Sequence, residues 1–257
     1  MILTADYHTH TKYSHGKSSV LENAIWAKDH GLKQIAVTDH GFSHPAFGLR
    51  KRKLPSLKND CQKATKITGV KVFTGIESNL TSADGHVDLK PKYYDDFEVF
   101  LAGIHKLILY RLGNYVNFSL PNLFCSFFNA KPSQQLIDRT TKAFVQAIKK
   151  NPIDMITHVN FCCFCDPVEV AKVAGDYGTY IEISAKKEHL TDEQLYKMGQ
   201  TGARFLISSD AHNFNRVGEI SLAVEKLKRI DFPLDKIDNI DGRFADFRFK
   251  NFKEKSL

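Results

Sequence analysis

The chain has 257 residues, of which 42% are hydrophobic and 25% charged, and its formal net charge is +7. This composition excludes a disordered or fibrous chain, and no apolar run approaches the roughly 20 residues that cross a bilayer, so no membrane partner is expected. The length fits one large barrel or two small domains. The charge fits a nucleic-acid partner, a phosphorylated substrate, or a basic surface that only water covers.

Short β-rich apolar runs alternate with helix-like stretches along the chain. Seven runs are predicted as strands: residues 2–7, 34–38, 70–76, 99–104, 153–157, 179–184 and 204–208. Amphipathic stretches with recognisable ends predict helices at residues 18–30, 134–150, 167–177 and 192–201. Alternation of this kind favours a parallel sheet, and seven repeats without a linker favour a single-domain α/β barrel over two domains.

Three stretches interrupt this alternation. Residues 79–89 contain Asp84-Gly85 between apolar residues, which predicts a short hairpin. Residues 106–132 form an aromatic-rich loop without clear periodicity, which is interpreted as a lid, an oligomer contact or a substrate pocket. Residues 243–257 are basic and contain phenylalanines, and they are expected to form a last helix that packs on the barrel.

Six of the seven predicted strands lead into residues of metal-ligand type. In chain order these residues are His8, His10, His40, Glu77, His105, His158, Asp210 and His212. In a barrel of parallel strands the carboxyl ends lie on one face, where such folds place their active sites. The sequence therefore predicts that these residues converge at one mouth of the barrel.

Local spacing supports a metal site. Alternate residues of a strand project to the same side, so His8 and His10 can reach one ion, and Asp210 and His212 repeat this spacing. His15 follows the first strand closely enough to join them. A buried group of histidines with few partners would be costly without an ion.

Other histidines have simpler explanations. His30, His86 and His189 are expected to be capping or surface residues, His30 because a helix C-terminus favours positive charge. His44 lies in a loop expected to overhang the site, and both a structural and a functional role are open for it.

The cysteines and the amino-terminal residues indicate the cellular compartment of the protein. Cys162, Cys163 and Cys165 are favoured as buried thiols or thiols beside the ligands, because a structural zinc site would need two separated pairs. A disulfide framework is not needed for a core of this size. The first residues show no secretion signal, so a cytoplasmic protein is expected.

Together, these motifs resemble the polymerase and histidinol phosphatase, or PHP, domain family. The resemblance covers nearly the whole chain and rests on six motifs in family order: residues 6–11, 38–41, 75–79, 102–105, 156–158 and 209–212. It implies one PHP-type domain over residues 1–257, folded as a distorted seven-stranded TIM-like barrel. Overall length and the hairpin at 79–89 are most similar to the compact stand-alone phosphatases of bacteria.

The resemblance also implies a trinuclear site for three divalent transition-metal ions, zinc, manganese or iron. His8, His10, Glu77 and Asp210 correspond to ligands of the first ion. Glu77 would bridge to a second ion that His105 and His158 also hold. His15, His40 and His212 correspond to ligands of the third ion. Glu77, Asp210 and His212 are thus the expected catalytic positions.

Such a site implies phosphoester hydrolysis. Three divalent ions, two carboxylates and one hydroxide keep a net charge of about +3, which attracts a phosphate dianion that the hydroxide attacks in line. Arg216 and Lys106 are candidates for holding the phosphate, with solvated surface as the alternative. Asp6, Asp39 and Ser184 are candidates for orienting the imidazoles, with a turn or strand-end role as the alternative.

The favoured function is a phosphatase acting on a small phosphomonoester. The segment after His158 and residues 106–132 depart from the family pattern and are expected to rim the pocket, so the substrate itself is not predicted. The alternatives are an exonuclease or phosphodiesterase on nucleic-acid ends, a histidinol-phosphate phosphatase, and a metal-dependent amidohydrolase. A metal-holding binding module would need a broken ligand set, and no ligand is missing. The oligomeric state is not predicted.

Overall fold

The computed structural model describes residues 1–110, 113–128 and 130–255. In this part of the chain, parallel strands form one sheet in chain order: β1 (Ala5–Thr9), β2 (Gln34–Val37), β3 (Lys71–Asn79), β4 (Val99–Gly103), β5 (Met155–Ile156), β6 (Tyr180–Ser184) and β7 (Phe205–Ser208). Beyond β7, Ala211 pairs with Thr9 of β1. The sheet is therefore a nearly closed barrel, and the predicted α/β fold is confirmed.

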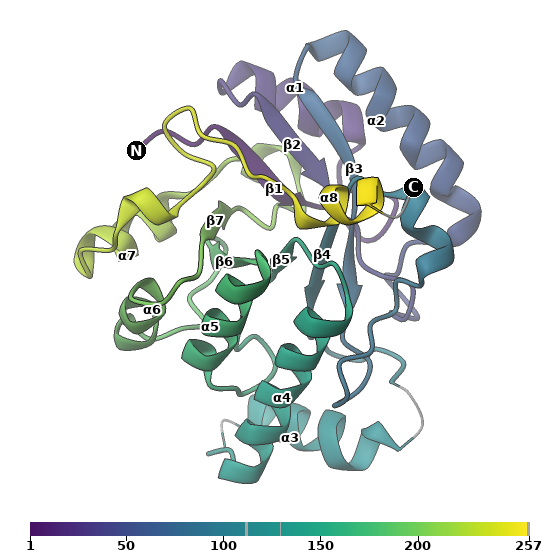
Figure 1. Ribbon diagram of the computed structural model, residues 1–257. Coiled ribbons are helices and arrows are strands. Elements are labelled where there is room, and N and C mark those ends of the chain that lie inside the picture. The colour runs from purple at the N-terminus through teal and green to yellow at the C-terminus, as the bar shows by residue number, and fades with distance from the viewer. Residues whose placement is uncertain (111–112, 129, 256–257) are drawn as a thin grey trace.

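Helices surround this sheet (Figure 1). They are α1 (Val20–Asp29), α2 (Leu54–Thr68), α3 (Leu120–Phe128), α4 (Gln134–Lys150), α5 (Pro167–Tyr177), α6 (Asp192–Gly199), α7 (Ser221–Arg229) and α8 (Arg248–Lys255). In the described ranges, none is long and apolar enough to cross a bilayer.

The predicted helices at 134–150 and 167–177 are confirmed to the residue, and the others differ at their ends. The helix predicted at 18–30 begins only at Val20, because the side chain of Ser19 accepts a hydrogen bond from the backbone of Glu22 and caps it. The helix predicted at 192–201 ends at Gly199. Helices α2 and α7 were not predicted. The last helix, α8, is shorter than the predicted 243–257, and residues 256–257 lie outside the described residues.

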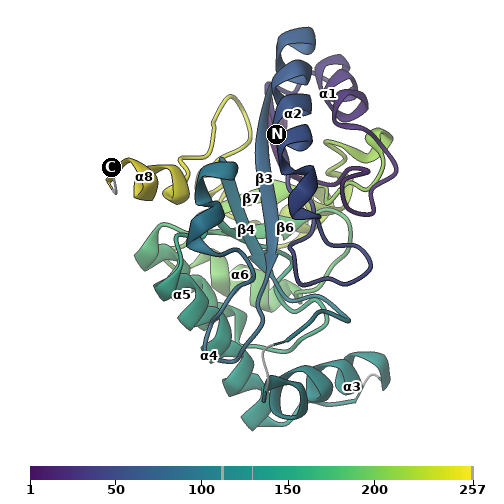
Figure 2. The ribbon, with the colours of Figure 1, turned by 90° about the vertical axis from the view of Figure 1, so that its right-hand side faces the viewer.

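Segment 106–132, apart from residues 111–112 and 129, which lie outside the described residues, is not the irregular loop that the sequence predicts. It contains a π-helical turn at Tyr115–Ser119 followed by α3, and it buries Phe118, Asn122 and Cys125. Figure 2 shows α3 beside α4, beyond the carboxyl end of β3. The other side of α3 exposes Phe127 and its neighbours, so apolar residues on both sides hide the helical period. The hairpin predicted at 79–89 is confirmed by the antiparallel bridge between Leu80 and Val87.

The barrel interior has an apolar floor below the strand ends. The floor residues form a buried cluster distinct from the one under the helices: Ala5, Tyr7, Ala36, Val99, Leu101, Met155, Tyr180, Leu206 and Phe247. Phe247, which precedes α8, closes the floor with its ring 4.9 Å from that of Tyr7.

Polar residues occupy the interior above this floor. Side chains of a strand alternate between its two faces, so Glu182 shares the inward face of β6 with Tyr180. Glu77 shares the inward face of β3 with Phe73 in the same way, and both carboxylates are buried. Gly103 on the neighbouring strand leaves room for Thr157 and His158, because a Cβ there would clash with the Thr157 hydroxyl and lie 2.9 Å from Cε1 of His158. The alternation thus places two acidic groups directly over an apolar floor.

Candidate metal centre

The residues predicted from the strand ends do converge at one mouth of the barrel. His8, His10, His105, His158 and Glu77 are buried, and His40 is only 7% exposed. Asp210 and His212 reach the same place from the segment after β7, which pairs with the end of β1. His15 joins them from the loop after β1, with its ring stacked 4.8 Å from that of His40.

Glu77 lies at the centre of this group, which we call the cage. Its Oε1 atom is 2.7 Å from Nε2 of His158, 3.1 Å from Nε2 of His105 and 3.3 Å from Nε2 of His8. Its Oε2 atom is 2.9 Å from Nδ1 of His40. The two carboxylate oxygens therefore face two different sets of imidazoles, as a bridging ligand must.

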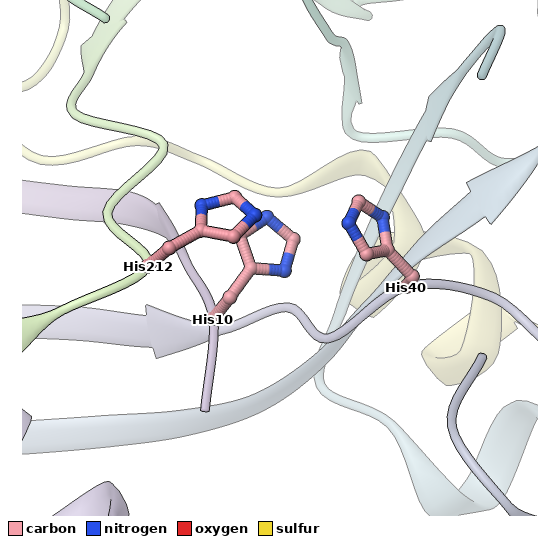
Figure 3. A group of neighbouring side chains, drawn as sticks. All are labelled: His10, His40 and His212. Atoms are coloured by element: carbon pink, nitrogen blue, oxygen red, sulfur yellow. The ribbon is translucent and has the colours of Figure 1, made fainter. Parts of the chain in front are cut away.

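Three overlapping groups of side chains bring their ligand atoms within 4.8 Å of one another. They are His8, His10 and Asp210; His40, Glu77 and His105; and His10, His40 and His212. Figure 3 shows the last group, with the rings of His10 and His212 together and that of His40 beside them. In this last group His10 accompanies His40 and His212, whereas the resemblance implied that His15 accompanies them as a ligand of the third ion.

Several buried polar atoms of the cage make no hydrogen bond in the described chain, although imidazole nitrogens and carboxylate oxygens lie close together there. These atoms are Nδ1 of His10, His40 and His158, Nε2 of His105, Oε2 of Glu77 and Oδ1 of Asp210. Unpaired groups of this kind cost free energy in a protein interior. All are donor atoms that divalent transition metals accept, so the residues present fit a metal cluster.

The charge states also suit metal binding. Burial opposes ionisation of Glu77, but the imidazoles, His105 foremost, outweigh it and hold the pKa of its carboxyl well below 4.5. Burial likewise opposes ionisation of Asp210, and His8 and His10 hold its pKa low. Burial lowers the pKa of His15 to about 3, so this ring is neutral and can donate a lone pair.

His8 behaves differently from the other rings. Burial would lower its pKa, but the charges of Glu77, Glu182 and Asp210 raise that pKa well above 6.5. A position where three carboxylates stabilise a proton also stabilises a metal cation.

Two residues that the sequence did not single out orient these imidazoles. Nδ1 of His8 lies 2.6 Å from Oε1 of Glu182, and Nδ1 of His105 lies 2.7 Å from Oδ1 of Asn79. Each contact leaves Nε2 of its ring directed at Glu77. Carboxylates and amides in this position fix the tautomer and orientation of a ligand histidine.

The three residues that the sequence predicted to orient the imidazoles make other contacts. Asp39 accepts hydrogen bonds from Thr11, at 2.8 Å from its backbone nitrogen, and from Ser14, and so holds the loop that carries His15. Asp6 accepts one from the backbone of Gly218 at 2.9 Å. Ser184 accepts one from the backbone of Lys186. Within the described residues none of the three side chains bonds to an imidazole.

A cavity of about 450 Å³ opens onto the cage. Outside the predicted ligands, the residues that line it are basic or aromatic: His44, Phe47, Lys106, Phe161, Lys186, Lys187 and His189. Lys106 thus lines the cavity, and its role in holding the phosphate stays a prediction. His189 was expected at a cap or on the surface, and it lies in this wall instead. Arg216 is exposed and is not among the lining residues.

Lys186 is the cation that reaches the cage. Its Nζ atom is 2.9 Å from Oδ2 of Asp210 and 3.1 Å from Nδ1 of His212. Nothing in the sequence distinguishes Lys186 beyond its place after a strand end. Cys162, Cys163 and Cys165 are buried free thiols, and burial raises the pKa of Cys162 to about 12.

Comparison with known proteins yields a family and a fold. The model of the PHP domain matches residues 6–225. A protein of Caldanaerobacter subterraneus named a probable phosphatase is 28% identical over 92% of this chain and 87% of its own length. Another so named, from a Thermoanaerobacter species, is 29% identical over 96% of this chain and 95% of its own.

A solved structure of similar fold is the histidinol phosphate phosphatase of Lactococcus lactis, in complex with zinc, L-histidinol and phosphate. It covers 91% of this chain and 95% of its own, with a TM-score of 0.60 and 15% identity. At this identity the likeness establishes the fold alone.

Proposed function

Because the chain belongs to the PHP domain family, we propose that it is a metal-dependent phosphatase that acts on a small phosphomonoester. The observation that carries this proposal is the cage, in which one buried carboxylate touches four histidines that come from four different strand ends. The family relatives named as probable phosphatases support the same activity.

The metal ligands that we propose are those that the sequence motifs implied. His8, His10, Glu77 and Asp210 would hold one ion, and Glu77 would share a second with His105 and His158. His15, His40 and His212 would hold a third. Bound divalent ions of this type lower the pKa of water and polarise phosphate oxygens.

The chain's own residues prepare the site for this chemistry. The low pKa values of Glu77 and Asp210 keep both carboxylates ionised at neutral pH. Glu182 and Asn79 hold two of the imidazoles in one orientation. Lys186 lies beside Asp210 and presents an ammonium group to the cavity, where it can hold an oxygen of the phosphate.

The overall reaction is the hydrolysis of one phosphate ester bond. Water adds to phosphorus, the bond between phosphorus and the organic oxygen breaks, and the alcohol leaves with a proton. Catalysis of this kind rests on positioning and charge, which the cage supplies. The cavity walls accept an organic group next to the cage, as a small phosphomonoester requires.

The test is elemental analysis of the purified protein followed by a screen for phosphate release. We expect two to three transition-metal ions per chain, activity on 4-nitrophenyl phosphate, and loss of activity on chelation. The screen includes histidinol phosphate, oligonucleotides and an amide, which represent the alternative functions. An active protein with one ion or fewer would contradict the cluster, and cleavage of the amide alone would contradict the phosphatase.

A further inference from the structure

The cavity wall beyond the cage has an unbalanced charge. Lys106, Lys186 and Lys187 all line it, and Asp210 is the one carboxylate among the described residues that line it. Asp210 is already engaged, because it contacts His10 at 3.1 Å and Lys186 at 2.9 Å. Lys186 is thereby balanced within the cage, whereas the other two lysines are not.

Lys106 and Lys187 have no carboxylate within ion-pair distance in the described parts of the chain. Glu188, the nearest acidic residue in sequence to Lys187, is bound elsewhere, at 3.3 Å from Lys226 and 3.2 Å from Arg229. The Nζ atom of Lys106 lies 4.6 Å from the centre of the Phe127 ring, a contact that leaves its charge uncompensated.

The two lysines lie on the same part of the wall. They come from the loops after β4 and β6, and the charges of both act on the thiol of Cys162 and lower its pKa, against the larger effect of burial. Phe161, the neighbour of Cys162, also lines the cavity, and its ring centre is 5.0 Å from those of His158 and of His189. An aromatic ring beside the cage is therefore accompanied by two unpaired ammonium groups.

A concave wall with this charge attracts anions and repels cations. We propose that the organic part of the substrate carries a second anionic group, a carboxylate or a second phosphate, which Lys106 and Lys187 bind while the first phosphate lies at the cage. This inference rests on the proposed function. It also separates this chain from an amine substrate such as histidinol phosphate, because the lining residues offer no carboxylate free to pair with an ammonium group.

Matched aryl phosphates test the proposal on the metal-loaded protein. The neutral reference is phenyl phosphate, the two anionic substrates are 4-carboxyphenyl phosphate and 1,4-phenylene bisphosphate, and the cationic one is 4-(aminomethyl)phenyl phosphate. The quantity measured is kcat/KM for each anionic substrate divided by that for phenyl phosphate. In the variant K106Q/K187Q we expect this ratio to fall about tenfold or more, since each bound charge contributes on the order of one factor of ten.

A control variant separates local binding from general attraction. Lys149 and Lys228 are exposed lysines of α4 and α7, and K149Q/K228Q removes the same two charges. We expect its ratio to equal that of the unaltered protein. The ratio of kcat/KM values for one pair of substrates is compared only between proteins, so differences in the intrinsic reactivity of the leaving groups do not affect the comparison.

The outcomes are distinct. A loss for the carboxylate alone or for the bisphosphate alone identifies which anion the lysines bind. An equal ratio in K106Q/K187Q and in the unaltered protein overturns the proposal. If none of the esters is hydrolysed, the proposed phosphatase function is wrong. Calorimetry with phenylphosphonate and 4-carboxyphenylphosphonate then still tests whether Lys106 and Lys187 bind a second anionic group. Equal affinity for these two phosphonates would then reject the anion site.

Discussion

Glu77 is a fully buried carboxylate whose ionised form depends on the imidazoles around it. Replacing it with alanine removes the group that faces both sets of imidazoles. We expect Glu77→Ala to lose two ions together and to lower kcat/KM about 1,000-fold or more, since bound metal supplies several kcal/mol of stabilisation to the transition state. Elemental analysis and phosphate release measure the two effects.

The matched control is His30→Ala, outside the cage. His30 follows α1 and stacks on Trp26, with ring centres 4.0 Å apart. Its loss should leave the metal content and activity close to those of the unaltered protein. Equal effects of the two substitutions would show that the cage is not the metal site.

Glu182 is a positioning residue in the proposed site, because it holds the ring of His8 rather than an ion. Glu182→Gln keeps the shape but removes the charge, and we expect metal affinity or activity to fall about 10- to 100-fold, as is usual for such partners of ligand histidines. Competition with a chelator measures the affinity directly. Glu193→Gln, on the exposed side of α6, is the control, and an unchanged affinity in Glu182→Gln would refute the role.

At the scale of elements, the side chain of Asp154 links α8 to the barrel through hydrogen bonds. Its carboxylate accepts hydrogen bonds from the backbone of Phe100 in β4, at 2.8 Å, and of Phe249 in α8, at 2.7 Å. Burial raises the pKa of Asp154 to about 7. Between pH 3.8 and 7 the folded protein therefore keeps a proton that the unfolded chain has released.

A pH dependence of stability follows. The contribution of Asp154 to stability is fully present below pH 3.8 and is lost as the pH rises through 7. The loss is on the order of a few kcal/mol, at 1.36 kcal/mol per pKa unit. Asp154→Asn cannot ionise, so the free energy of unfolding from urea titrations should change less between pH 4.5 and 8 than in the unaltered protein. The same change in both proteins would contradict this expectation.

Helix α3 exposes a row of apolar side chains beside the cavity. Phe124, Phe127 and Phe128 are 58%, 62% and 72% exposed, and Phe127 contacts Lys106 of the cavity wall. We expect Phe127→Ser to alter the ranking of phosphomonoesters while the metal content stays the same, because the ring would contact the organic part of the substrate and not the phosphorus.

The competing explanation is that this row packs between subunits. Light scattering distinguishes the two, because an interface residue would change the mass of the particle and leave the ranking unaltered. Phe252→Ser, at an exposed position of α8, controls for the loss of an exposed phenyl ring. An unaltered ranking together with a smaller particle would reject the role of α3 at the cavity.

At the scale of the whole molecule, the sequence predicted the seven strands, their parallel barrel and the residues that meet at the strand ends. This was possible because a ligand-type residue directly after an apolar run has a known place in any parallel barrel. Glu182 was missed because it lies inside a strand, and its inward direction depends on the phase of β6 in the closed sheet. The signal was present, since it is the only charged residue in Tyr180–Ser184.

Other misses have local causes. Helix α2 follows the basic run Lys51–Lys53 without a side-chain cap, so the N-cap signal is absent and only Pro55 in the first turn marks its start. Lys186 was missed because a lysine after a strand is ordinarily solvated, and only the position of Asp210 across the mouth distinguishes it. Segment 106–132 concealed its helix because apolar residues lie on all sides of it.

The pairing of Thr9 with Ala211 has a consequence for the nascent chain. His8 and His10 leave the ribosome early, whereas Asp210 and Asn239 follow after most of the chain has been synthesised. The side-chain amide of Asn239 donates to the backbone carbonyls of Ala5 and Ile207, at 2.8 and 2.7 Å, so a residue near the end of the chain links β1 to β7. His8 and His10 therefore meet Asp210 only after most of the chain has been synthesised. We therefore expect a shortage of metal during synthesis to lower the yield of folded protein, and not only the turnover of the protein that has folded.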